Sequence, residues 1–127
     1  MKITLPILKQ DFVDGEVVTT ETERSFVVDT SVYSEERWEM NFPALAQKES
    51  LFQYIERIEN AESTLKRSRI ISLLKAVYCF IEPTSGEMSY KEFAQLFSVS
   101  DVGYTERLVD TLTSAFNAIL NSSATKN

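Results

Sequence analysis

The residues of this chain whose spacing best suits acid–base chemistry are three glutamates in one short segment, Glu35, Glu36 and Glu39. Glu35 and Glu39 are four residues apart, so on a helix their carboxylates would lie one turn apart on one face. Two carboxylates can act as general acid and general base without another residue type. Acidic residues also stabilise the start of a helix through its dipole, and we interpret the three glutamates as a solvated helix start.

Other residues that support catalysis or metal binding are scarce. The chain has no histidine and one cysteine, Cys79, which removes the usual nucleophile pairs and leaves too few ligands for zinc. Its glycines form no phosphate-binding loop, and the acidic residues around Asp14-Gly15 lack the spacing of a calcium loop. Cys79 stands between Tyr78 and Phe80 and is predicted to be a buried apolar side chain. We therefore predict a protein that is not an enzyme and has no cofactor or metal.

Length, charge and hydropathy describe a small acidic globular protein. The chain has 127 residues, 43% of them hydrophobic and 25% charged, with a net charge of −6. A chain of this size buries enough apolar surface to fold without disulfides. Acidic surfaces repel nucleic acid and anionic lipid. No apolar run approaches the ~20 residues that span a bilayer. The N-terminus also lacks the apolar core of a signal peptide. We expect a cytoplasmic protein whose partner is neither nucleic acid nor a membrane.

The first part of the chain has the pattern of β-strands. Ile3 and Leu5 alternate with other residues, as side chains do on the two faces of a strand. The Asp14-Gly15 pair readily adopts the positive φ angles of a tight hairpin turn. Residues 25–29 form another β-branched run, which predicts a third strand.

Helical periodicity dominates the rest of the chain. Between Ile70 and Ile81 the apolar residues surround the helix axis on nearly all sides, which is typical of a central core helix. Helices are predicted over residues 34–42, 43–60, 63–81, 89–97 and 103–120, with a turn at 84–86. We therefore predict one α+β domain, mainly α: a small antiparallel β region over residues 1–32, a bundle of about five helices over 33–120, and a flexible tail over 121–127.

A basic cluster begins the third predicted helix. Lys66, Arg67 and Arg69 are adjacent or nearly so. We interpret them as the solvated end of a helix that is buried further on, paired with Glu59 and Glu62. The alternative is a role in binding a partner.

Residues 89–116 have the outline of a helix-turn-helix motif, a short helix and a longer one joined by a turn. Ser89 and Glu92 fit a capping box that starts the short helix. However, Ser98 stands where the motif expects glycine, and the segment carries four acidic residues against two basic ones. Binding duplex DNA requires several basic side chains to neutralise phosphates. DNA binding through residues 89–116 is the alternative function.

Residues 34–58 carry a resemblance to a known family. They contain an Arg-Trp-Glu-x-x-Phe-Pro segment around Trp38 and a Leu-Phe-x-Tyr-Ile-Glu-Arg-Ile segment that starts at Leu51. This stretch resembles the tail assembly chaperones of long-tailed siphophages that infect Gram-positive bacteria. The resemblance implies a non-virion protein of the infected host's cytoplasm, which self-associates and keeps the tape measure protein soluble until the tail tube assembles.

Aromatic side chains are the candidate partner-binding residues. A tape measure protein is a long helical chain with recurring apolar positions, and such surface aggregates unless it is masked. An apolar groove would bind helices of this kind, and aromatic residues supply much contact area at low entropic cost. The candidates are Trp38, Phe42, Phe93, Phe97 and Phe116. Each of them has an alternative role in the core, where most large aromatic residues lie.

Overall fold

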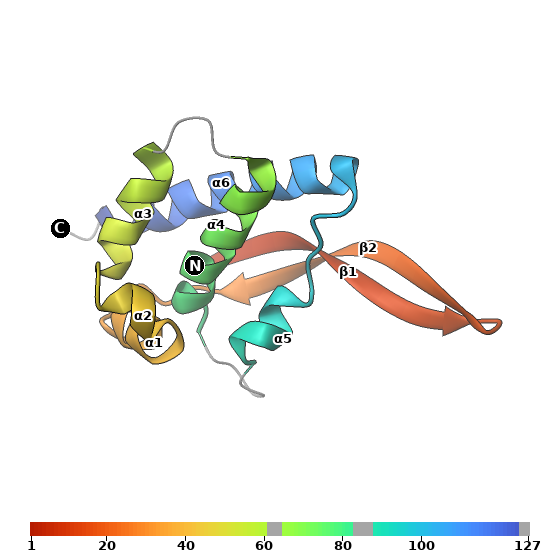
Figure 1. Ribbon diagram of the computed structural model, residues 1–127, viewed down its shortest axis with the longest axis horizontal. Coiled ribbons are helices and arrows are strands. Elements are labelled where there is room, and N and C mark those ends of the chain that lie inside the picture. Colours follow the sequence, from red (N-terminus) through yellow and green to blue (C-terminus); the bar gives the residue numbers. More distant parts are fainter. Residues whose placement is uncertain (61–64, 83–87, 125–127) are drawn as a thin grey trace.

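The computed structural model describes residues 1–60, 65–82 and 88–124, with side chains to residue 121. Two antiparallel strands precede six helices in this part of the chain (Figure 1). The elements are β1 (Lys2–Val13), β2 (Glu16–Val27), α1 (Tyr33–Asn41), α2 (Pro43–Ala46), α3 (Leu51–Asn60), α4 (Lys66–Phe80), α5 (Tyr90–Ala94) and α6 (Val102–Ala124). The predicted α+β fold, mainly α, is confirmed.

The two strands form one long hairpin. They pair without interruption from Lys2 opposite Val27 to Val13 opposite Glu16. At the turn Asp14 has a φ of 51° and the next residue, a glycine, a φ of 81°. Positive φ at both central positions is the signature of a type I′ turn, whose twist matches that of the strands. The predicted hairpin and its turn are confirmed.

The third predicted strand is not a separate element. Residues 25–27 are the end of β2, because the ladder continues past the polar middle of the strand. Val28, just beyond it, makes an isolated bridge to Ile81 after α4. The N-terminal sheet therefore has two strands of 12 residues each instead of three shorter ones.

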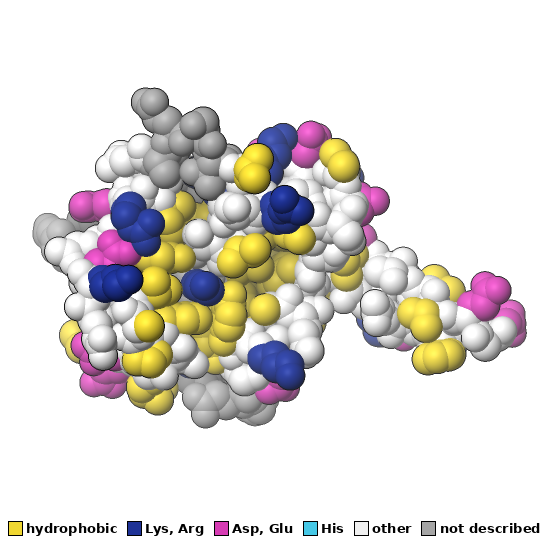
Figure 2. Space-filling model, in the orientation of Figure 1, with side chains coloured by type: hydrophobic (Ala, Val, Ile, Leu, Met, Phe, Trp, Pro, Cys, Tyr) yellow, Lys and Arg dark blue, Asp and Glu magenta, His cyan; other side chains and the backbone are white. Residues whose placement is uncertain are grey.

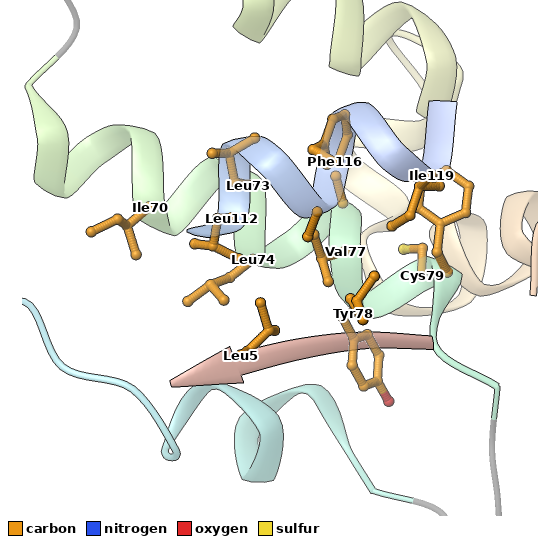
Figure 3. Packing of buried hydrophobic residues seen from close by; sticks show 14 of the residues in the cluster. Leu5, Ile70, Leu73, Leu74, Val77, Tyr78, Cys79, Leu112, Phe116 and Ile119 are labelled. Carbon is orange, nitrogen blue, oxygen red and sulfur yellow. The ribbon is translucent and has the colours of Figure 1, made fainter. Parts of the chain in front are cut away.

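Helix α4 is the centre of the core, as predicted. It packs against α6, α3, α1 and α5, and Figure 3 shows its apolar side chains between those of α6 and β1. Eight of its residues are buried: Ile70, Leu73, Leu74, Ala76, Val77, Tyr78, Cys79 and Phe80. A helix with so many buried positions exposes little of its circumference.

Only the base of the hairpin belongs to this core. Ile3, Leu5 and Phe26 are buried against the helices. Tyr104 of α6 donates a hydrogen bond from its hydroxyl to the carbonyl of Pro6 at 2.8 Å. Beyond this base, residues 9–25 are exposed, and the hairpin projects from the helical body as an arm (Figure 1).

The second predicted helix is in fact two. After α2 the chain turns, and Ser50 begins α3 with reciprocal hydrogen bonds: Gln53 N donates to Ser50 Oγ at 3.2 Å, and Ser50 N donates to Gln53 Oε1 at 2.8 Å. This is a capping box, which satisfies two amides that a helix start leaves free. The helix predicted over residues 43–60 therefore breaks between Ala46 and Leu51.

The helix ends also differ from the predicted ones. Helix α6 continues to Ala124, so the first residues of the predicted flexible tail are helical. The short helix α5 ends at Ala94, before the predicted end at Phe97. The predicted start of the third helix at residue 63, the turn at 84–86 and the tail residues 125–127 lie outside the described part of the chain.

Candidate functional site

Three of the five aromatic candidates are core residues. Trp38 has an exposed fraction of 0%, and Phe93 and Phe116 are also buried. The ring of Trp38 lies 4.7 Å from that of Tyr54, centroid to centroid, and its Nε1 donates to the carbonyl of Glu49 at 3.0 Å. These three side chains are enclosed by the fold and offer no surface to a partner in this conformation.

The other two aromatic candidates lie at the surface of the core. Phe42 and Phe97 are partly buried. Phe42 packs edge-on against Tyr90 at 5.0 Å between ring centroids. Phe97 lines a pocket of about 340 Å³ between α4, α5 and the segment that follows α5, together with Ile70, Ile71, Leu74, Tyr90, Ala94, Ser98 and Val99. Of the predicted set, these two therefore remain accessible.

A second hollow continues this pocket toward the start of α6. Its volume is about 240 Å³, and it shares Val99 with the first. The rest of its lining consists of Leu65, Lys66, Arg67, Val102, Thr105 and Glu106. We call the two hollows together the α4–α5 groove. It brings α4 and α5 together with the start of α6, which follows α5 in the sequence.

The lining of the α4–α5 groove is apolar and open to solvent. The exposed fractions are 46% for Ile71, 66% for Leu65 and 76% for Val102. Figure 2 shows hydrophobic side chains gathered in a hollowed area on the face that carries α4 and α5. Contiguous apolar surface of this kind marks an interaction site on a soluble protein.

Basic side chains border the groove. Arg67 lines it, and with Ile71 and Lys75 it forms a stripe spaced by four residues along α4. The Lys75 ammonium lies 6.0 Å from the ring centroid of Phe42, and Lys91 is exposed on α5. Lys and Arg side chains surround the apolar area in Figure 2. The lining of the groove itself carries two basic side chains, Lys66 and Arg67, and one acidic side chain, Glu106, so its border is net positive in a chain whose net charge is −6.

The predicted pairing of the basic cluster is wrong where the structure describes it. Lys66 Nζ pairs with Glu106 Oε1 of α6 at 3.2 Å, instead of with Glu59. Both side chains are largely exposed, so the pair contributes little to stability. Arg69 Nη1 donates to the carbonyl of Ile58 at 3.5 Å. Glu62 lies outside the described residues.

The three glutamates lie on α1 and have different surroundings. The carboxylate of Glu35 accepts a hydrogen bond from the backbone N–H of Leu51 at 3.2 Å, and so ties α1 to the start of α3. Glu36 and Glu39 are exposed. The interpretation as a solvated helix start therefore holds for two of them, while Glu35 has a structural contact.

The single thiol is buried in α4. The Cys79 sulfur donates to the carbonyl of Lys75 at 3.3 Å, and burial raises the pKa of the thiol to about 12. A thiol with this pKa stays protonated at neutral pH, whereas the thiolate is the nucleophile. The predicted buried, apolar role of Cys79 is confirmed.

The described part of the chain lacks both a cluster of metal ligands and a membrane-spanning helix. It contains no group of three or more histidine, cysteine, aspartate or glutamate side chains that could hold a metal ion. None of its helices has both the length and the apolar character needed to cross a membrane.

The geometry of residues 89–116 does not favour DNA binding. The capping box of Ser89 and Glu92 is present, but α5 has only five residues. Helix α6 packs one face against α4 and β1. The one basic residue of α6, Arg107, pairs with Glu21 of the arm, while the exposed residues nearby include Asp110. A surface of this charge repels phosphates.

Comparisons with known proteins give no family assignment. No protein-family model matches the chain, and neither a curated protein nor a solved structure matches it. The function is therefore inferred from the groove and from the resemblance of residues 34–58.

Proposed function

We propose that this protein is a bacteriophage tail assembly chaperone that keeps the tape measure protein soluble by binding its helices in the α4–α5 groove. The observation that carries the proposal is the open apolar groove with a basic border. The class of client comes from the resemblance of residues 34–58. On this proposal the protein acts in the cytoplasm of the infected host and is absent from the finished tail.

A helix with one apolar stripe fits such a groove. Helix-in-groove binding uses apolar residues at i, i+3, i+4 and i+7 of the ligand as anchors. The pocket beside Ile71 and Phe97 would take one large anchor, and the hollow beside Leu65 and Val102 the next. Arg67 at the border would attract acidic residues that flank the stripe, which increases the association rate and sets the orientation.

The charge of the whole molecule suits a chaperone. A net charge of −6 favours solubility. Each groove is short, so the affinity of one site is modest and a growing tail tube could displace the protein. Many copies along one client would together keep it covered.

Salt dependence separates this function from DNA binding. We expect a fluorescently labelled amphipathic peptide, with leucine or phenylalanine at i, i+3, i+4 and i+7 and glutamates at its ends, to bind this protein. Its affinity should fall less than about tenfold between 50 and 500 mM salt, because apolar burial provides most of the free energy. Fluorescence anisotropy measures both affinities, with a labelled DNA duplex as the comparison.

The opposite result would favour the helix-turn-helix function. A DNA contact with several phosphates loses about a thousandfold or more in affinity between 50 and 200 mM salt. Tight, steeply salt-dependent binding of the duplex, with no binding of the peptide, would contradict the chaperone proposal.

A further inference from the structure

The arm carries exposed apolar side chains at its tip. Phe12 has an exposed fraction of 80%, and Val13, Val17 and Val18 are exposed as well. Phe12 stands opposite Val17, and Val18 stands opposite Asp11, so neighbouring pairs place apolar side chains on both faces of the ribbon. A two-stranded hairpin alone is marginally stable in water. A contact at its tip would stabilise this arm.

Among the described residues, no backbone hydrogen bond or ion pair joins the arm tip, residues 11–18, to the helical body. The last backbone hydrogen bond from β1 to the helical part runs from Leu8 N to the carbonyl of Leu96, at 2.8 Å. On β2 the outermost contact is the pair of Glu21 with Arg107. Beyond these two points the arm extends away from the helices (Figure 1). The described helices therefore leave the tip uncovered and open to another molecule.

The tip and the α4–α5 groove are complementary in charge. Asp11, Asp14 and Glu16 stand beside the apolar residues of the tip, and all three are exposed. The groove is apolar, and its charged lining, Lys66 and Arg67 with Glu106, is net positive. In a contact between the two surfaces, acidic residues around the apolar tip would meet basic residues around the apolar groove. Such complementary charges make an interface specific for one partner.

We propose that the arm tip of one copy docks in the α4–α5 groove of a second copy of this chain. Phe12 enters the pocket beside Ile71 and Phe97, whose volume of about 340 Å³ accepts a large side chain. The acidic residues around the turn at Asp14 face Arg67 of the second copy. The occupant of the groove in the absence of a client is thus the arm of a neighbour.

This contact joins different surfaces of the two copies. A joined pair of copies keeps one free arm and one free groove, so the contact is head-to-tail and leads to a ring or an open chain of copies. The assembly does not depend on the identity of the client. If the protein has the proposed chaperone function, on which this consequence rests, client helices compete with the arm for the groove.

The self-association of the purified full-length protein, without any client, tests the proposal. We expect the mass measured by sedimentation velocity to increase with concentration beyond that of a dimer. Phe12→Ser and Ile71→Glu should each weaken self-association at least tenfold. Both side chains are substantially exposed, so the variants should fold, which circular dichroism verifies. Val32→Ser, at an exposed valine before α1, is the matched control and should associate as the wild type does.

Mixing the two variants distinguishes this contact from any other. Phe12→Ser keeps an intact groove and Ile71→Glu keeps an intact arm, so an equimolar mixture should form one-to-one heterodimers that grow no further. A wild type that stays monomeric, or a mixture without heterodimers, would overturn the proposal. Association that Phe12→Ser abolishes and Ile71→Glu leaves intact would show that arms pair with arms.

The same variants separate this inference from the proposed function. Phe12→Ser should still bind the amphipathic peptide, because its groove is unchanged. Loss of self-association with peptide binding retained supports both proposals. Failure of Phe12→Ser to bind the peptide, with a wild type that does self-associate, would contradict only the chaperone function.

Discussion

Trp38→Ala is expected to lower the free energy of unfolding by about 3–5 kcal/mol, the usual loss for a large buried aromatic side chain. The Trp38 side chain is fully buried and packs on Phe42 and Tyr54, at 5.5 and 4.7 Å between ring centroids. Its Nε1–H also satisfies the carbonyl of Glu49, which holds α1 against the turn before α3. Urea denaturation followed by circular dichroism measures the loss.

Two further substitutions in α1 provide the comparison for the stability loss expected of Trp38→Ala. Trp38→Phe keeps the apolar contact but leaves the Glu49 carbonyl without its donor, so we expect a loss of about 1–3 kcal/mol. Met40→Ala removes an exposed side chain of α1 and should change stability by less than about 0.5 kcal/mol. If Trp38→Ala were as mild as Met40→Ala, Trp38 would not be a core residue, and its role as a partner contact would have to be reconsidered.

Ile71→Glu is expected to weaken binding of the amphipathic peptide at least about thirtyfold, which corresponds to the loss of about 2 kcal/mol that defines an interface hot spot. Ile71 lies in the middle of the groove lining, between Arg67 and Lys75 on α4. A carboxylate there would have to be desolvated when an apolar stripe covers it. Fluorescence anisotropy with the same peptide measures the change.

The control for this variant is the same substitution outside the groove. Val32→Glu replaces an exposed valine before α1 and should leave the affinity for the peptide unchanged. Equal affinities for wild type, Ile71→Glu and Val32→Glu would show that the α4–α5 groove is not the binding site.

The sequence predicts those elements whose signal is local. The turn at Asp14-Gly15 is an example, because few residue pairs accept positive φ at two successive positions. The length of the hairpin is not predictable in this way, since residues 19–24 of β2 show no alternation of apolar and polar side chains. The break before α3 does have a local signal, the capping box of Ser50 and Gln53, which periodicity alone does not reveal.

The position of the groove depends on tertiary packing and has no local signal. Ile71 belongs to an apolar stretch that periodicity assigns to the core, yet it is exposed, because none of the described helices covers that side of α4. The reverse holds for Arg37, which is buried: its Nη2 donates to the carbonyl of Tyr78 at 3.0 Å. Among aromatic side chains, the sequence does not distinguish Phe97 at the groove from Phe93 in the core.

Co-expression with a tape measure protein tests the central claim most directly. The chosen tape measure protein is one encoded near this chain in its genome and insoluble when expressed alone. We expect it to become soluble and to co-purify with wild-type protein and with Val32→Glu, but not with Ile71→Glu, because apolar client helices aggregate unless the groove covers them. A client that stays insoluble with the wild type, or that Ile71→Glu solubilises equally well, would contradict the proposed function.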